Sequence, residues 1–249
     1  IMRNWKQIKY KFNSLRFGWQ LKSHKVNLKK ISNSQILLIC CQRNEKTRLN
    51  HFLKYYRELG VQHFLFIDNN STDQSLNYLS DFDDISIWKT SGSYKKSNFG
   101  MHWCNFLLNK YCQKKWCIIV DPDEYLVYPH SESRSLISLI YFMKDNGQKS
   151  LFTPLVDMYS KKKISETNLI EGNDPLNVCK YFDKYNFKIS KNREAEGLWL
   201  QGGPRRRIFF QKNPNLAPAL NKVSLIFWDS GYFYISSMHQ LIPNYLNCN

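Results

Sequence analysis

From residue 35 onward, short apolar runs alternate with segments in which apolar residues recur every three or four positions. Residues 36–41 form the first run, which is typical of a buried strand. The next segment ends before Gly60, a residue suited to a helix C-terminal cap, and its apolar positions have helical spacing: Leu49, Phe52, Leu53, Tyr56 and Leu59. This alternation predicts an α/β fold with a doubly wound, Rossmann-like, mostly parallel sheet.

The same pattern predicts further strands at 63–67, 85–88, 116–120 and 151–156, and helices at 98–112 and 136–143. A charged, loop-like segment at 160–200 follows, which we interpret as a mobile or acceptor-side segment. Short strands are predicted at 208–210, 224–228 and 232–235. We divide the chain into a basic arm (1–34), an α/β domain (35–240) and the start of a C-terminal extension (241–249). We expect the chain to be a fragment of a longer protein.

Polar clusters follow three of the predicted strands. Arg43-Asn44-Glu45 follows the first strand, residues 68–73 follow the second, and residues 121–124 follow the fourth. Open α/β sheets bind ligands beyond the carboxyl ends of their strands. The three clusters therefore predict one ligand site at this edge of the sheet.

Asp121 and Asp123 are two residues apart, so in extended backbone both carboxylates point to the same side. Two carboxylates form a hard-oxygen site that suits Mg²⁺ or Mn²⁺, which usually also binds phosphate oxygens of a substrate. Pro122 is suited to the end of a strand. The alternative interpretation of this segment is an acidic turn at a strand terminus.

The order and spacing of the motifs resemble the family 2-like glycosyltransferases, and in particular a subgroup with RNE, DNNSTD and DxDE-aromatic-Leu blocks. The resemblance covers roughly residues 35–240. The matching blocks are Arg43-Asn44-Glu45, 66–73 and 121–126, and then 157–160, 202–205, Lys222-Val223 and 236–239.

This resemblance implies a GT-A fold with a C-terminal acceptor-side portion, a nucleoside-diphosphate-sugar donor, and a divalent metal cofactor, Mn²⁺ or Mg²⁺. Asp121, Asp123 and His239 would then be the metal ligands. Together with their places in the sequence, the resemblance suggests nucleotide-binding roles for Arg43, Asn44, Asp68, Asn69, Asn98, Gly100, Asp121 and Arg205. The alternative for residues 68–73 is a turn that caps the following helix.

An inverting transfer needs a carboxylate that takes the proton of the acceptor hydroxyl. The Glu-Asp pair that many family 2 enzymes carry is not present, so the base is chosen among Asp157, Glu194, Glu196 and Asp229. We favour Asp157, which follows a predicted strand and lies in a matching block, and include Glu196 as the second candidate. The guanidinium groups of residues 205–207 are candidates for neutralising the leaving diphosphate, although alternation makes it improbable that all three face one ligand.

Residues 1–31 carry nine Lys or Arg and no Asp or Glu, and the whole chain has a formal charge of +16. One helical stripe of this arm is apolar: Trp5, Ile8, Phe12, Leu15 and Trp19. A basic amphipathic helix can lie on an anionic membrane surface. The alternative is a helix that docks on its own domain.

The predicted function is therefore metal-assisted transfer of a sugar to a hydroxyl of a glycan, glycolipid or polysaccharide. We expect a cytoplasmic enzyme with peripheral membrane contact through residues 1–31 and no nucleic-acid partner. A nucleic-acid-binding protein is the first alternative, but no binding module is recognised and the acidic strand ends would repel phosphates. A nucleotidyltransferase is the second, but residues 40–43 lack the expected glycines. An inactive scaffold with the same fold is the third.

The seven cysteines do not suggest a disulfide framework.

Overall fold

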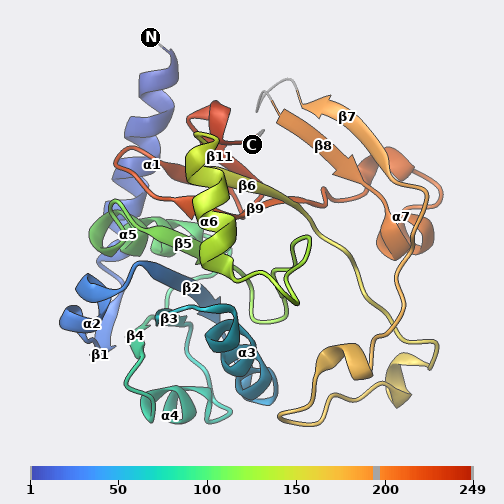
Figure 1. Ribbon diagram of the computed structural model, residues 1–249, viewed down its shortest axis with the longest axis horizontal. Coiled ribbons are helices and arrows are strands. Elements are labelled where there is room, and N and C mark those ends of the chain that lie inside the picture. The colour runs from blue at the N-terminus through green and yellow to red at the C-terminus, as the bar shows by residue number, and fades with distance from the viewer. Residues whose placement is uncertain (1, 193–196, 248–249) are drawn as a thin grey trace.

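The computed structural model describes residues 2–192 and 197–247, and its fold is α/β (Figure 1). Within these residues the central sheet has seven strands in the order β1-β4-β3-β2-β5-β9-β6. The four middle strands β4, β3, β2 and β5 are parallel, whereas β1 and β9 run opposite to them and β6 is antiparallel to β9. The bounds are β1 (Lys22–Lys25), β2 (Ile36–Gln42), β3 (His63–Asp68), β4 (Ile85–Lys89), β5 (Trp116–Ile119), β6 (Ser150–Pro154) and β9 (Asn221–Phe227). The predicted doubly wound, mostly parallel, Rossmann-like sheet is confirmed.

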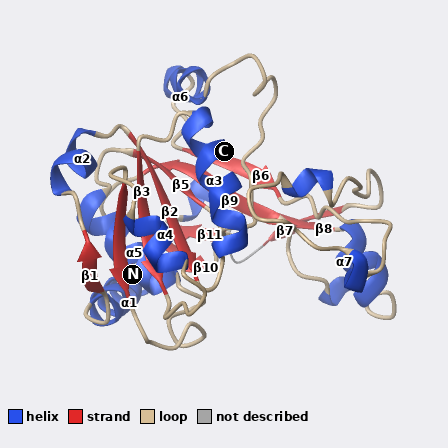
Figure 2. Ribbon diagram, turned by 90° about the horizontal axis from the view of Figure 1, so that it is seen from below, coloured by secondary structure: helices blue, strands red, loops and turns tan. Residues whose placement is uncertain are grey.

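Helices cover both faces of this sheet (Figure 2). They are α1 (Met2–Gly18), α2 (Leu28–Asn33), α3 (Lys46–Leu59), α4 (Ser75–Ser80), α5 (Met101–Tyr111), α6 (Leu136–Asp145) and α7 (Gly203–Phe209). Successive side chains of a strand point to opposite faces. In β2, Leu37 and Ile39 therefore join the core under α5, whereas Leu38 and Cys40 join the core under α3.

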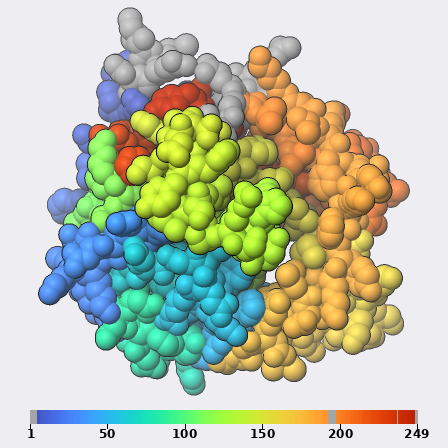
Figure 3. Space-filling model, viewed as in Figure 1, coloured from blue at the N-terminus to red at the C-terminus, as the bar shows by residue number. Residues whose placement is uncertain are grey.

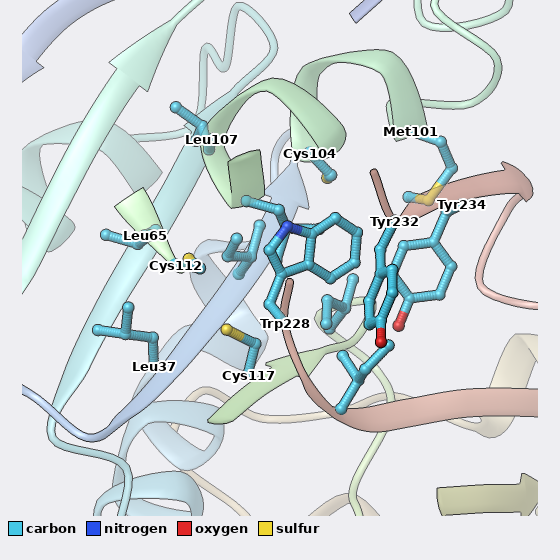
Figure 4. Packing of buried hydrophobic residues seen from close by; sticks show 14 of the residues in the cluster. Leu37, Leu65, Met101, Cys104, Leu107, Cys112, Cys117, Trp228, Tyr232 and Tyr234 are labelled. Atoms are coloured by element: carbon cyan, nitrogen blue, oxygen red, sulfur yellow. The ribbon is translucent and has the colours of Figure 1, made fainter. Parts of the chain in front are cut away.

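The core on the α5 side also contains the C-terminal aromatic residues. Trp228, Tyr232 and Tyr234 lie side by side in this core (Figure 4), and the ring centroids of Trp228 and Tyr234 are 5.9 Å apart. Tyr234 belongs to β10 (Phe233–Ser236), which pairs with β11 (Gln240–Ile242). Asn105 of α5 binds both backbone groups of Tyr234, at 2.9 Å each. The side-chain amide thus fixes β10, and with it the chain that leads to His239.

Residues 155–192 and 197–220, which we call the side segment, form the right-hand side of the molecule in Figure 3. It contains the hairpin β7 (Lys188–Asn192) and β8 (Gly197–Gln201), helix α7, and the short 3₁₀ helices Ile164–Glu166, Pro175–Asn177 and Pro214–Leu216; a fourth follows at Asn244–Asn247. An ion pair between Lys46 and Glu171, and a contact of 3.7 Å between His51 Nε2 and Asp174 Oδ1, join this segment to α3.

Most of the predicted strands and helices are present at nearly their expected bounds, but one predicted strand is wrong. Residues 208–210 were expected to be extended, yet they lie at the end of α7. Pro204 is in the first turn of this helix, where its fixed φ and missing N–H are tolerated. The β7–β8 hairpin lies within the segment that was expected to be loop-like, and β1 was not predicted.

Residues of the predicted basic arm pack with the rest of the domain. Strand β1 pairs with β4 at the edge of the sheet, and α1 lies against α5 and β10. No helix among the described residues is both long enough and apolar enough to cross a membrane. The cysteines described are all free, and four of the six are buried.

Candidate functional site

Helix α3 holds the acidic segment that follows β5. The Tyr56 hydroxyl donates to the Glu124 carbonyl at 2.9 Å and accepts the Leu126 N–H at 3.1 Å. The Tyr55 hydroxyl donates to the Leu126 carbonyl at 2.7 Å. Both tyrosines come from the helix whose apolar side packs on the sheet, so the segment with Asp121 and Asp123 is fixed at the carboxyl edge of the parallel strands.

Lys222 lies between two carboxylates of this segment. The β5–β9 register pairs Ile118 with Leu225, and its continuation places Lys222 opposite Asp121. The Lys222 Nζ is 2.6 Å from Glu124 Oε1 and 3.4 Å from Asp121 Oδ2, and only 6% of the lysine side chain is exposed. Burial raises the pKa of both Asp121 and Glu124, and the charge of Lys222 opposes this shift.

Asp123 is exposed and has no hydrogen bond or ion pair within the described residues. His239 lines the same cavity as Asp123, and its Nδ1 lies 2.6 Å from the Asn221 carbonyl. Because that carbonyl is an acceptor, Nδ1 carries the proton and Nε2 keeps its lone pair. Burial lowers the pKa of His239, which also favours the neutral ring.

These two side chains fit a divalent metal in part. A neutral histidine whose other ring nitrogen donates to a carbonyl is the usual form of a metal ligand, and Asp123 is a free carboxylate. Within the described residues, no group of three or more His, Cys, Asp or Glu side chains has the spacing to hold a metal ion. Any ion held here would need further oxygens from a bound substrate.

The first cavity, of about 380 Å³, opens beyond the ends of β2, β3 and β5. Its lining includes Arg43, Asn69 and the ring of Tyr94, together with Asp121 and Asp123. The Asn69 amide nitrogen donates to the carbonyls of Thr90 and Gly92, so its amide oxygen is the group left to meet a ligand. An aromatic residue, an amide oxygen and a guanidinium that line one cavity suit a nucleoside with a phosphate attached.

The other residues expected to bind the nucleotide organise this cavity rather than line it. Asp68 is 1% exposed and accepts from the Gln42 side chain and the Ser71 N–H. The Asn44 side chain accepts the Thr72 N–H, and that of Asn98 donates to the Ile235 carbonyl. Gly100 has a φ of 80°, and a Cβ there would lie 3.2 Å from Tyr94.

The second cavity, of about 560 Å³, lies between the sheet edge and the side segment. Asp157 and Arg205 form a bidentate ion pair on its wall, with the Arg205 Nε at 2.7 Å from Asp157 Oδ2. Lys222 and His239 line it as well. Asp121 and Asp123 line both cavities, so they stand where the two spaces meet.

The remaining candidates lie elsewhere. Asp229 pairs with Lys114 and lines neither of these cavities, and Glu194 and Glu196 are outside the described residues. Arg207 pairs with Asp183, and Arg206 donates to the Pro214 carbonyl. Of the three consecutive arginines, Arg205 is therefore the one that lines the second cavity. Consecutive residues of a helix point in different directions, so the three side chains of α7 do not face one ligand.

Two residues of the site were not assigned by sequence reasoning. Lys222 stood in a matching block, yet its partner could not be known without the antiparallel register of β9. Tyr94 lies in a loop without periodicity, and its place over the first cavity depends on the backbone of residues 97–100. Ser97 supports that backbone, because its hydroxyl donates to the Tyr94 carbonyl and accepts the Gly100 N–H.

Comparisons with known proteins give no family. No family model matches the chain, and no curated protein matches its sequence. A crystal structure of 4-diphosphocytidyl-2C-methyl-D-erythritol synthase is similar over 53% of this chain and 65% of its own, with 15% identity and a TM-score of 0.33. The chain thus spans slightly less than two thirds of that protein. This likeness is too low to support a function, and the fold assignment stands on the sheet order.

We predict that Lys222→Met lowers the free energy of unfolding by about 3 kcal/mol at pH 7, because it leaves the mostly buried Glu124 carboxylate and the partly exposed Asp121 carboxylate without their cation. The loss should shrink as the pH falls, since protonation of Asp121 and Glu124 then removes the uncompensated charge. Urea denaturation at several pH values measures it. Lys114→Met is the matched control, because it breaks an exposed pair with Asp229 and should cost under about 1 kcal/mol. Equal losses for both variants would contradict the prediction.

Proposed function

We propose that the protein is a GT-A-type glycosyltransferase that moves a sugar from a nucleoside-diphosphate-sugar donor to a hydroxyl acceptor. The observation that carries this proposal is the position of Asp121 and Asp123 on the wall that two cavities share. Sugar transfer needs a nucleotide on one side of the diphosphate and an acceptor on the other. A pair of carboxylates between two spaces suits that arrangement, and it agrees with the motif order in the sequence.

The donor nucleoside would occupy the first cavity. Its base would stack on Tyr94, Asn69 would accept a hydrogen bond from the base or ribose through its free amide oxygen, and Asp121 would face the ribose or diphosphate. Arg43 lines the same cavity and would contact a phosphate.

A divalent metal, Mn²⁺ or Mg²⁺, would be held by Asp123 and the Nε2 of His239 together with the donor diphosphate. Asp121, which the resemblance also makes a metal ligand, pairs with Lys222 and would instead face the ribose or diphosphate. The second cavity has four carboxylates, from Asp121, Asp123, Glu124 and Asp157, against the two cations Lys222 and Arg205. The net formal charge of this lining is therefore −2, at the place where an anionic diphosphate must bind. A divalent cation would cancel this net negative charge. When bound, the metal would stabilise the charge of the leaving diphosphate.

The acceptor would enter the second cavity, where Asp157 is the proposed base. As the acceptor oxygen attacks the anomeric carbon, its proton passes to Asp157 and the bond between that carbon and the phosphate oxygen breaks. The nucleoside diphosphate then leaves. Arg205 would fix the orientation of the Asp157 carboxylate through its two hydrogen bonds. The acceptor class, a glycan or a lipid-linked sugar, is suggested by the sequence resemblance.

We predict that Asp123→Asn lowers donor turnover on the order of 100-fold, because it removes the charge of a ligand that acts on the leaving group. His239→Ala should have a smaller effect. Release of nucleoside diphosphate from a panel of nucleotide sugars, with and without chelator, measures this loss. Asp145→Asn is the control, since Asp145 is an exposed residue of α6 that lines neither cavity. Full activity in chelator would remove the metal. Release of pyrophosphate from a nucleoside triphosphate in the presence of a sugar phosphate, with no nucleoside diphosphate released from nucleotide sugars, would instead assign nucleotidyl transfer.

We also predict that Tyr94→Ala weakens nucleoside-diphosphate binding about tenfold, since stacking of a base on an aromatic ring contributes roughly 1–3 kcal/mol. Tyr141→Ala is the matched control, because Tyr141 is an exposed tyrosine of α6 that lines neither cavity. Titration calorimetry with Mn²⁺ present measures both variants. An unchanged affinity for Tyr94→Ala would place the base elsewhere.

A further inference from the structure

Helix α1 has one face packed against the domain. The Tyr10 hydroxyl donates to the Ile235 carbonyl at 3.2 Å, and the Gln7 amide donates to the Gly231 carbonyl at 3.3 Å. Ser14 and Phe17 are buried, and the Phe17 ring lies 5.0 Å from that of His102 on α5. Figure 1 shows α1 beside α5 at the edge of the molecule, with its N-terminal end projecting. The residues that attach this helix to the domain are therefore on this face and do not belong to the apolar stripe.

The apolar stripe faces away from the domain. Its five side chains are between 48% and 88% exposed: Trp5, Ile8, Phe12 and Leu15 on α1, and Trp19 in the turn directly after the helix. On a helix wheel with 3.6 residues per turn, this stripe lies opposite the packed face. A continuous row of large exposed apolar side chains on a water-soluble surface marks a contact site. The helix thus docks on its own domain, as the second interpretation of the sequence expected, but through the face opposite the stripe.

Cations lie on both sides of the stripe. Lys9 is four residues from Trp5 and three from Phe12, Arg16 is four from Phe12 and three from Trp19, and Lys11 is three from Ile8 and four from Leu15. Residues at these spacings are neighbours on a helix surface. All three cations are exposed and have no ion pair within the described residues. Their charges are therefore available to an external anion.

We propose that this face of α1 lies in the interface of an anionic membrane. An apolar stripe with flanking cations matches both parts of such a surface, because acyl chains accept the apolar side chains while the headgroups meet the Lys and Arg. Tryptophans at both ends of the stripe suit the interface, where a ring is partly apolar and partly hydrogen-bonded. Charge complementarity favours this occupant over an apolar protein groove, which would leave Lys9, Lys11 and Arg16 unpaired.

Docking through α1 would also orient the candidate site. The Ile235 carbonyl accepts hydrogen bonds both from Tyr10 of α1 and from Asn98. Asn98 lies just before α5, the helix that begins beside the first cavity. Two and four residues further on, Ser237 and His239 line the second cavity. The helix is thus attached to the strand that leads into the site. The membrane proposal itself does not depend on glycosyl transfer.

Flotation of the full chain with vesicles tests the proposal. Wild type should bind equimolar phosphatidylserine–phosphatidylcholine vesicles far more than phosphatidylcholine alone, and binding should fall as salt rises. The triple variant Lys9→Gln, Lys11→Gln and Arg16→Gln should bind the anionic vesicles on the order of 100-fold more weakly, at about fivefold per cation. The double variant Phe12→Ser and Trp19→Ser should lose at least about tenfold.

Phe142→Ser with Phe209→Ser is the matched control, because both rings are exposed on other helices. It should bind as wild type does. Thermal melting checks that every variant is folded, and nucleotide binding is measured separately so that failure of the proposed activity is not confused with failure of docking. Absence of wild-type flotation, equal flotation by all variants, or a dimer in sedimentation that Phe12→Ser with Trp19→Ser dissociates would overturn the proposal.

Discussion

The candidate site depends on the ion pairs that Lys222 forms with Glu124 and Asp121. Three carboxylates within four residues repel one another. The Glu124 side chain is only 14% exposed and that of Asp121 34%, and uncompensated charge is costly where water is limited. The cation comes from β9, which enters the sheet antiparallel between β5 and β6. This strand direction places Lys222 opposite Asp121. The lysine therefore forms ion pairs with Asp121 and Glu124, while Asp123 remains free for a ligand.

The surrounding structure keeps this arrangement in place from three sides. Tyr55 and Tyr56 fix the acidic segment to α3, and Asn105 fixes β10, which leads to His239. On the third side, the Asp157–Arg205 pair joins the chain after β6 to α7 and forms a wall of the second cavity. Each of these contacts links segments far apart in sequence, so the geometry of the site follows from the packing of the whole domain.

The parallel core was predictable because its signals are local. The apolar run that became β2, the helical spacing of α3 and the cap at Gly60, whose φ is 109°, each follow from a few adjacent residues. The grouping of polar clusters at one sheet edge followed from the parallel order. The α7 helix was missed because a Pro at a helix start and three arginines resemble a loop and a strand end. Asp68 shows the limit at the site, because its residue type suits a ligand contact, whereas its burial and its hydrogen bond from Gln42 depend on the packed fold and cannot be read from the sequence.

The most direct test is a crystal structure of the protein with Mn²⁺ and a nucleoside diphosphate. We predict the base on Tyr94, the diphosphate at the wall shared by the two cavities, and an anomalous peak for Mn²⁺ between Asp123, His239 and the phosphate oxygens. The second cavity should remain open for the acceptor. A nucleotide bound away from Asp121 and Asp123, or no binding at millimolar concentration, would contradict the central claim that this edge of the sheet is a donor site.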